Sequence, residues 1–325
     1  MFDRRTFLAD MYGVKHESIY NYQNFYEIKN NPEVQVVYIV LPNGMHHEFT
    51  LRSAKAGKHV LCEKPMANTV KEAEEMVKAC ADAKVKLMIA YRIQYEPKNR
   101  EAKRLIREKA FGPLKILELS NCQNETKTNL THWRQNKKLA GGGALPDIGL
   151  YCLNTARFQT GEEPIEVGAM VSSNPKDPRF KEVEETVIFW LRFPSGVIAN
   201  CLTSYSSFEV KRWLANFDGG QLEMDPGFSY NGLRLFRSRV AEKTELKGIE
   251  KGEITLKEVN QFAAEMDHFS DCVVNNKKPY TPGEEGLQDQ RIMAAIYEAA
   301  AKQAPVKLKE FKGTDVFRGP EPVQE

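Results

Sequence analysis

Hydrophobic and polar positions divide the chain into two regions with different periodicity. In the first region, nearly continuous apolar runs alternate with segments in which apolar residues recur at helical spacing. The runs predict strands at 34–43, 58–65 and 86–92, and the periodic segments predict helices at 2–12, 24–29, 46–56 and 69–83. Apolar, β-branched strands separated by helices indicate parallel βαβ units whose strands are buried on both faces.

The second region has the pattern of an α+β unit. A helix is expected at 97–109, and strands of antiparallel type are expected at 114–121, 165–172, 186–193, 197–206 and 212–218. A hairpin turn is expected at 193–196, and two further helices at 258–274 and 286–300. We therefore predict an α/β domain at 1–95, followed at 96–325 by an α+β domain with a large, mainly antiparallel sheet.

Charge and apolar content argue against two classes of partner. The 325 residues carry 46 Lys and Arg against 44 Asp and Glu, a formal net charge of +2, without a long run of like charge. This lacks the electrostatic footprint of a nucleic-acid-binding protein. The longest apolar runs fall well short of the ~20 residues that a membrane-spanning helix requires, so we expect no membrane span.

Cysteine and histidine spacing gives no indication of a metal site. The six cysteines are widely separated and form no C-x-x-C pair, which argues against both zinc binding and a disulfide scaffold. Free buried thiols are expected instead. The six histidines form neither H-x-x-x-H nor H-E-x-x-H, so we assign no metal and expect most of them to be surface or structural residues.

Polar residues follow the predicted parallel strands at three points. These strand ends are Leu41-Pro42-Asn43, Glu63-Lys64-Pro65 and Tyr91-Arg92. An open parallel sheet binds its ligand at the carboxyl ends of its strands, which makes Lys64 a candidate functional residue. Taken alone, however, a lysine at a strand end is more often only a solvated charge.

A glycine-rich segment, LAGGGALPDIGLYCLN, carries the second candidate group. Its glycines permit close approach to a ligand, and Pro146 suits the first turn of a helix that places Asp147 and Tyr151 on one face. A carboxylate and a phenol so placed can orient a substrate hydroxyl and accept its proton if a cation is nearby. The alternative is a glycine-rich connection before a capped helix in which Tyr151 is simply packed.

Trp133 and Arg134 stand side by side just before the glycines. Such a pair can stack on a planar ring and bind a phosphate. Packing of the tryptophan at a domain interface is an equally common arrangement.

An ordered set of motifs resembles one known family. The set consists of LPNGMHHEF, AGKHVLCEKPMA, KLMIAYRIQYEP, LAGGGALPDIGLYCLN, GEEPIEV and PGEEGLQDQRIMAAIYEAA. It resembles the Gfo/Idh/MocA oxidoreductases over nearly the whole chain, and in particular their glucose-fructose oxidoreductase branch, which has tyrosine rather than histidine at the position of Tyr151. The resemblance implies a Rossmann-type domain with tightly held NADP(H), and a C-terminal domain whose open sheet packs against partner subunits in a homodimer or homotetramer.

The resemblance also implies the chemistry. Lys64 and Tyr151 match the catalytic pair of the family: the tyrosine would take the proton of a sugar C1 hydroxyl while hydride leaves C1 for the nicotinamide, giving a lactone. Lys64 would stabilise the phenolate, and Asp147 would position the sugar. In the type enzyme of this branch, the retained cofactor then reduces a second sugar.

The positions that match the family's cofactor contacts are Arg4, Tyr22, Leu41, Pro42, Asn43, Glu63, Lys64, Arg92, Trp133, Arg134 and Tyr230. Arg4 lies where the family places a cation near the adenosine 2′-phosphate. This match favours NADP over NAD.

The chain lacks one feature of the family, the glycine-rich phosphate-binding loop G-x-G-x-x-G. We therefore expect an N-terminally truncated form with an incomplete Rossmann-type sheet. As given, the chain is expected to be cytoplasmic, whereas a full-length form could be exported to the periplasm.

Two other functions remain open at this stage. One is a simple NAD(P)-dependent sugar or dihydrodiol dehydrogenase of the same family, which would release its cofactor at every turnover. The other is a non-catalytic regulator that senses a ligand. The presence of Lys64, Asp147 and Tyr151 favours an enzyme, and the missing phosphate loop favours the regulator.

Overall fold

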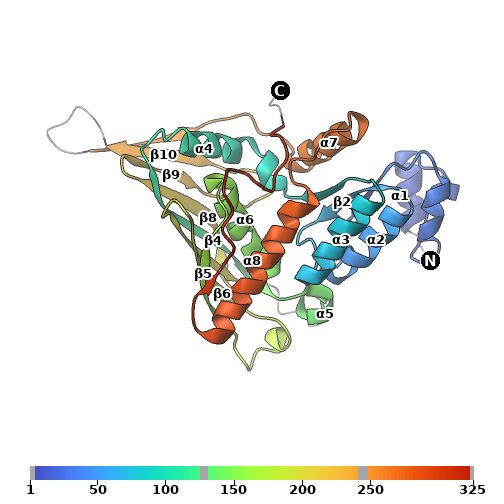
Figure 1. Cartoon of the computed structure of the whole chain (residues 1–325), viewed down its shortest axis with the longest axis horizontal. Helices are drawn as coiled ribbons and strands as arrows, with labels where there is room; N and C mark the ends of the chain where they lie inside the picture. The colour runs from blue at the N-terminus through green and yellow to red at the C-terminus, as the bar shows by residue number, and fades with distance from the viewer. Residues whose placement is uncertain (1–3, 125–130, 241–247, 323–325) are drawn as a thin grey trace.

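The chain folds around two sheets, a three-stranded one and a nine-stranded one (Figure 1). The computed structural model describes residues 4–124, 131–240 and 248–322. Helices lie between the sheets, and the two sheets belong to different regions of the chain, as the periodicity predicted.

The small sheet is parallel, in the order β1-β2-β3, which confirms the βαβ prediction. Its strands are β1 (Val36–Ile39), β2 (His59–Glu63) and β3 (Leu87–Ala90), and the helices of this part are α1 (Arg4–Tyr12), α2 (His46–Lys55) and α3 (Val70–Asp82). β2 and β3 are largely buried, but the prediction that every strand is buried on both faces is wrong for β1, where only Ile39 is buried. β1 is an edge strand within the described residues, so its open flank leaves its side chains half exposed.

The large sheet has the order β11-β10-β9-β8-β4-β7-β6-β5-β12. Its strands are β4 (Leu114–Asn124), β5 (Glu166–Ser172), β6 (Thr186–Arg192), β7 (Ile198–Ser204), β8 (Ser206–Phe217), β9 (Gly220–Met224), β10 (Leu235–Val240), β11 (Ile249–Ile254) and β12 (Val306–Lys307). The predicted hairpin between β6 and β7 is confirmed. The prediction missed β9 to β12, which are short or largely polar.

One pair of strands differs from the predicted antiparallel arrangement. β4 and β7 run parallel at the centre of the sheet, so the expectation of antiparallel strands is wrong for this pair. The physical reason is that alternation of apolar and polar residues reports which face of a strand is buried, and carries no information on the direction of its partner.

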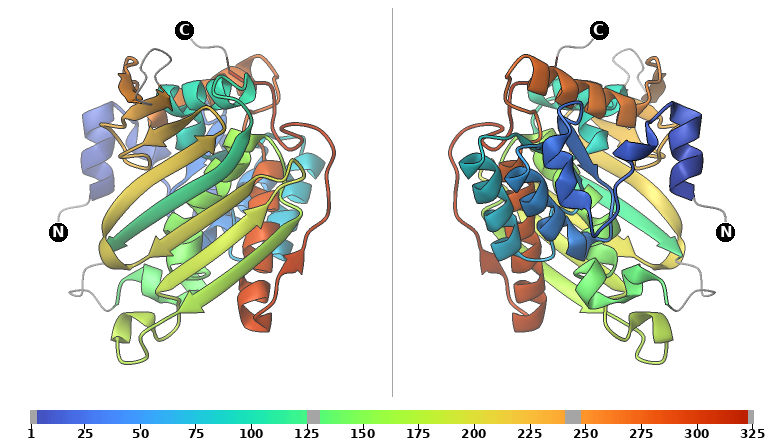
Figure 2. Two further views of the ribbon diagram at one scale, coloured as in Figure 1. Left: turned by 90° about the vertical axis from the view of Figure 1, so that its left-hand side faces the viewer. Right: turned by 90° about the vertical axis from the view of Figure 1, so that its right-hand side faces the viewer.

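Helices cover one face of the large sheet and leave the other open. The remaining helices are α4 (Pro97–Arg107), α5 (Lys137–Ala140), α6 (Leu150–Thr160), α7 (Gln261–Val274) and α8 (Gly283–Lys302), and short 3₁₀ turns occur at His16–Ser18, Phe25–Asn30, Asn43–Met45, Arg92–Tyr95, Trp133–Gln135 and Pro178–Phe180. α6 and α8 lie between the two sheets (Figure 1). In the left view of Figure 2, the strands of the large sheet face the viewer with no helix in front of them.

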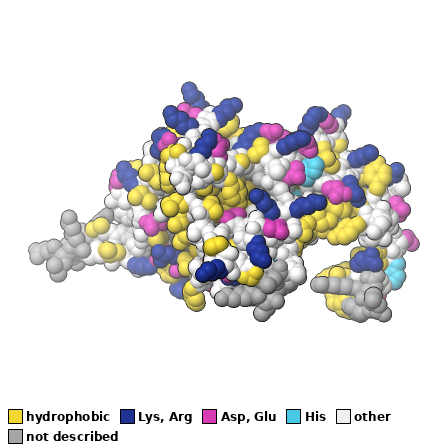
Figure 3. All heavy atoms as spheres, turned by 90° about the horizontal axis from the view of Figure 1, so that it is seen from below, with side chains coloured by type: hydrophobic (Ala, Val, Ile, Leu, Met, Phe, Trp, Pro, Cys, Tyr) yellow, Lys and Arg dark blue, Asp and Glu magenta, His cyan; other side chains and the backbone are white. Residues whose placement is uncertain are grey.

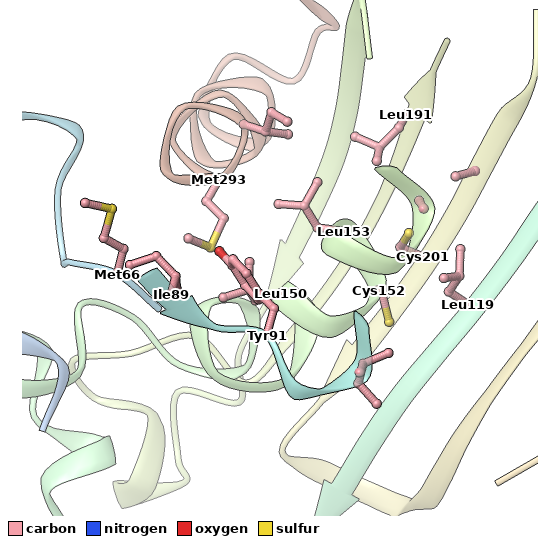
Figure 4. Close-up of a cluster of buried hydrophobic side chains, with 14 of the residues drawn as sticks. Met66, Ile89, Tyr91, Leu119, Leu150, Cys152, Leu153, Leu191, Cys201 and Met293 are labelled. Atoms are coloured by element: carbon pink, nitrogen blue, oxygen red, sulfur yellow. The ribbon is translucent and has the colours of Figure 1, made fainter. Parts of the chain in front are cut away.

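The hydrophobic core is continuous from one sheet to the other. Ile89 of β3, Leu150 of α6 and Leu119 of β4 belong to a single cluster of buried side chains (Figure 4). All six cysteines are free and buried, which confirms the expectation of buried thiols. The domain boundary at residues 95–96 stays a prediction, because α8 packs against α3 as well as against the large sheet.

A buried cluster of charges holds α6 to α8. Arg157 of α6 donates hydrogen bonds to Glu163, Glu285 and Asp289, at N···O distances of 2.8, 2.9 and 2.6 Å for the closest contact with each. Arg318 also donates to Glu285, at 2.6 Å. These five side chains are at most 2% exposed, so the geometry of the two helices depends on their mutual pairing.

Two further searches bear on membranes and metals. Among the helices of the described residues, none combines the length and the apolar character needed to cross a membrane. In the same part of the chain, His, Cys, Asp and Glu side chains do not gather in groups of three or more around a common point where a metal ion could bind.

The buried cluster generates the first prediction. Replacing Arg157 by Met should lower the free energy of unfolding by about 3–5 kcal/mol, because three carboxylates would be left buried without a shared cation. Urea denaturation would measure the change. Arg192→Met is the matched control: this arginine is 43% exposed and paired with Glu166 at 2.9 Å, and losing an exposed pair should cost less than about 1 kcal/mol. Equal losses in the two variants would contradict the assigned role of Arg157.

Candidate active site

A pocket of about 670 Å³ lies where the carboxyl ends of the small sheet meet the inner face of the large sheet. Its wall includes all three strand ends that the sequence singled out, at Leu41 to Asn43, at Glu63 and Lys64, and at Arg92. It also includes Asp147, Tyr151, Trp133, Arg134 and Tyr230. The predicted catalytic residues and most of the predicted cofactor contacts are therefore brought together in one cavity.

Lys64 and Asp147 connect the two regions of the chain in this pocket. Lys64 Nζ donates to the backbone oxygen of Asp147 at 2.6 Å and to its Oδ1 at 3.1 Å. Burial acts to lower the pKa of Lys64, but the facing Tyr151, Asp147 and Glu63 outweigh burial and raise it above its usual value. Lys64 is therefore a cation at neutral pH that keeps its proton and donates hydrogen bonds.

Asp147 is held from three directions. Besides Lys64, Arg134 Nε donates to Oδ2 at 3.0 Å and the Tyr205 hydroxyl donates to the same oxygen at 2.6 Å. Burial acts to raise the pKa of Asp147, but Lys64 and Arg134 lower it to about 2. The carboxylate is therefore ionised and fixed in place, and it is a poor proton acceptor.

Tyr151 lies between two cations. Lys64 Nζ is 4.6 Å and Arg92 Cζ is 5.0 Å from the centroid of its ring. Arg92 Cζ is also 4.5 Å from the ring centroid of Tyr230, so the guanidinium lies between two tyrosines. The sequence analysis required a cation near this tyrosine, and two cations are present.

The start of the α6 segment differs from the helix that Pro146 predicted. Leu145–Gly149 forms a wide π-helical turn, and the α-helix proper begins at Leu150. The Glu184 carboxylate accepts the backbone N–H of Gly143 at 2.8 Å and that of Leu145 at 2.9 Å. A distant side chain thus caps this turn, which sets the angle at which Asp147 and Tyr151 reach Lys64.

His46 holds two of the strand ends together. Its Nε2 is 2.8 Å from the backbone oxygen of Leu41, and its Nδ1 is 2.8 Å from that of Pro65. The side chain is fully buried, and burial lowers its pKa despite these two carbonyl groups. His46 is a structural histidine, as the sequence analysis expected for most of them.

One predicted cofactor contact, Tyr22, lies elsewhere, and a second, Arg4, stays untested. Tyr22 does not line the pocket: it is 57% exposed, and its ring centroid is 5.5 Å from that of Phe49 on α2. The backbone of Arg4 belongs to α1, and its side chain lies outside the described part of the structure. The proposed cation beside an adenosine phosphate stays a prediction.

The large sheet contributes polar pocket residues that the sequence analysis missed. Asn121 of β4 and Lys211 of β8 are direct cross-strand partners, and both line the pocket. On each strand every second residue faces inward. The inward-facing positions next to Asn121 and Lys211 are apolar, at Leu119 and Trp213. A polar residue that interrupts an inward-facing apolar row was the signal available in the sequence.

The pocket is positively charged and suits an anionic ligand. Its wall carries four cationic side chains against two carboxylates, with Lys64, Arg92, Arg134 and Lys211 facing Glu63 and Asp147. Arg92 is 4% exposed, and its Nε has no hydrogen-bond partner. Among the described residues its other two nitrogens donate to neutral oxygens, those of Ser229, Gln261 and Phe228, rather than to a carboxylate. Charges of both signs are otherwise intermixed, as the surface in Figure 3 illustrates for one face.

Comparison with known proteins places the chain in a family. Residues 3–91 match the model of an oxidoreductase family with an NAD-binding Rossmann fold, and residues 99–223 match the GFO/IDH/MocA C-terminal domain. D-xylose 1-dehydrogenase [NADP(+)] of Haloarcula marismortui is 33% identical over 304 residues, which span 92% of this chain and 81% of the relative. 1,5-Anhydro-D-fructose reductase of Ensifer adhaerens is 29% identical, over 85% of this chain and 80% of the relative.

A solved structure is similar over most of the chain. It is an aldose-aldose oxidoreductase from Caulobacter crescentus complexed with glycerol, with 41% identity and a TM-score of 0.87. The match covers 93% of this chain and 88% of that one. The family models match both halves of the fold, these relatives are similar over most of the chain, and this chain belongs to the GFO/IDH/MocA family of oxidoreductases.

Proposed function

We propose that this protein oxidises an aldose at C1 to the lactone, with NADP(H) as its cofactor. The observation that carries the proposal is the meeting of Lys64, Asp147 and Tyr151 in a cationic pocket large enough for a nicotinamide and a sugar. Relatives named as an NADP(+)-dependent xylose dehydrogenase and an aldose-aldose oxidoreductase support both the substrate class and the cofactor. If the cofactor is retained, reduction of a second sugar would complete the cycle.

The described residues fit a dinucleotide on one side of the pocket. Arg92, a buried cation without a carboxylate partner among these residues, would face an electron-rich or anionic part of the ligand. The other residues that would hold it are Leu41, Pro42, Asn43, Glu63, Trp133, Arg134 and Tyr230. When bound, the nicotinamide of NADP supplies a hydride acceptor. NAD is the less favoured cofactor.

Tyr151 is assigned as the group that takes the hydroxyl proton. Asp147 is unsuited to this step, because its pKa of about 2 and its hydrogen bonds from Lys64 and Arg134 keep it ionised and occupied. Lys64 and Arg92 both lie over the ring of Tyr151 and would stabilise negative charge that develops on it during the proton transfer. Asp147 keeps Lys64 in place, and through it the position of the sugar hydroxyl.

The open face of the large sheet is assigned to contact with a second copy of the chain. Met170, Ile188 and Leu202 are neighbours across β5, β6 and β7, with exposed fractions of 74%, 46% and 36%. Such a row of apolar residues on a sheet without covering helices is typical of an interface between subunits. A homodimer or homotetramer is the expected assembly.

Replacing Tyr151 by Phe tests the catalytic assignment. Loss of the proton acceptor should lower kcat for oxidation of D-xylose or D-glucose by roughly 10²–10⁴-fold. Formation of reduced nicotinamide would be followed by absorbance, and cofactor binding by quenching of tryptophan fluorescence. Tyr26→Phe, at a surface tyrosine, should leave both unchanged. Retention of wild-type turnover by Tyr151→Phe would overturn the proposal.

Placing a charged residue on the open face of the large sheet tests the predicted subunit interface. Ile188→Glu should convert the oligomer to a monomer, because a carboxylate would have to be buried without a partner. Light scattering coupled to gel filtration gives the molar mass. The control is Val274→Glu at the end of α7, where the side chain is 76% exposed and lies away from the sheet. An unchanged mass for Ile188→Glu would place the subunit contact elsewhere.

A further inference from the structure

A second, much smaller cavity adjoins the catalytic pair. It has a volume of about 10 Å³ and shares Lys64 and Tyr151 with the large pocket. Tyr91, Ile93, Leu150, Asn154 and Thr155 complete its wall. A cavity of this size has room for about one water molecule.

Tyr91 carries an unsatisfied polar group at this cavity. Its hydroxyl is buried beside the Asp289 carboxylate, and it makes no hydrogen bond of good geometry with the described residues. Burial raises the pKa of Tyr91, and the facing carboxylates of Asp289 and Glu285 raise it further. Figure 4 shows the side chain extending from the end of β3 toward α8, beside Met293. A water molecule in the cavity would give this hydroxyl the partner that it lacks.

Behind Tyr91 lies the buried charge cluster, which has an excess of negative charge. Its two cations, Arg157 and Arg318, face three carboxylates, Glu163, Glu285 and Asp289. A fully buried excess charge is unfavourable and is relieved when one carboxylate binds a proton. Burial accordingly raises the pKa of Asp289, although Arg157 opposes this, and Glu285 raises it further.

Asp289 and Glu285 are each one hydrogen bond away from the cavity wall, and Asp289 is the one that Tyr91 faces. Asn154, which lines the cavity, donates to Asp289 Oδ2 at 2.8 Å, and Arg157 donates to Oδ1 at 2.6 Å. The groups that face the Glu285–Asp289 pair from the surrounding elements are Tyr91, Gln94, Asn154, Arg157 and Arg318.

We propose that the small cavity holds a water molecule that links Lys64 and Tyr151 to Tyr91 and Asp289, which together store the proton released by sugar oxidation. The proposal rests on the proposed function. The proton leaves the sugar hydroxyl for Tyr151, passes through the water and the Tyr91 hydroxyl, and ends on the Asp289 carboxylate, which becomes neutral. The hydride leaves separately for the nicotinamide. In a coupled second half-reaction, the same proton returns by the same route to the sugar being reduced.

Infrared titration of the cofactor-free protein tests the stored proton without any turnover. Two protonated carboxyl bands should persist above the pH range of ordinary carboxylates: that of Glu265, whose pKa burial raises to about 9, and a second band that is absent in Asp289→Asn. Glu163→Gln removes one carboxylate without touching the cavity, so it should move the titration of this second band to lower pH. Identical bands in the wild-type protein and in Asp289→Asn would overturn the proposal, whether or not the enzyme oxidises sugars.

Turnover tests the path itself. With NADP and D-xylose, the wild-type kcat for oxidation should decrease as the pH is lowered, because protonated Asp289 cannot accept another proton. Tyr91→Phe and Asp289→Asn should each lower kcat roughly tenfold with KM little changed, since each interrupts one proton transfer. The acid limb should disappear in Asp289→Asn.

Tyr95→Phe is the matched control for Tyr91→Phe. Tyr95 is also buried in the same segment, and its hydroxyl lies 3.1 Å from Thr281, away from the cavity. This control should keep the wild-type pH profile. If the wild-type enzyme oxidises D-xylose and both Tyr91→Phe and Asp289→Asn retain its kcat and its acid limb, the path is wrong while the proposed function stands.

Discussion

The pairing of Arg157 with three carboxylates is the constraint on which the arrangement of this molecule depends. The segment that begins at Leu145 must present Asp147 and Tyr151 to Lys64, a residue of the other sheet, while α6 is held from behind by α8. A buried guanidinium requires acceptors in fixed directions, so few relative positions of α6 and α8 are permitted. The active-site geometry is thus anchored by charges that do not line the large pocket.

Asp147 and Tyr151 have different roles in the pocket. Asp147 is neutralised by Lys64 and Arg134 and behaves as a fixed anchor. Tyr151 lies between Lys64 and Arg92, and the proposed function assigns the proton transfer to it. In the sequence, an aspartate and a tyrosine four residues apart look equivalent as candidates. Their surroundings distinguish them, and the difference follows from which cations reach each group.

The small cavity lies next to the large pocket and shares residues with it, and the charge cluster is hydrogen-bonded to the wall of the small cavity. Lys64 and Tyr151 line both cavities, so the proposed catalytic residues also border the cavity that Tyr91 and Asn154 line. The network combines an unsatisfied hydroxyl on Tyr91 with an excess carboxylate around Asp289. A fold that needed these charges only for stability could have paired them evenly. The excess is what connects the structural role of the cluster to the chemistry beside it.

Local sequence determined the elements and much of the site. The apolar runs before Leu41, Lys64 and Arg92 predicted parallel strands, and the ends of parallel strands meet at one edge, so these residues could be expected to converge. Local sequence could not determine the parallel pairing of β4 with β7, the capping of the Leu145 turn by Glu184, or the meeting of Asn121 with Lys211. Each of these joins residues far apart in the chain. Periodicity reports only which face of an element is buried, and the identity of the partner on that face is decided when the elements pack.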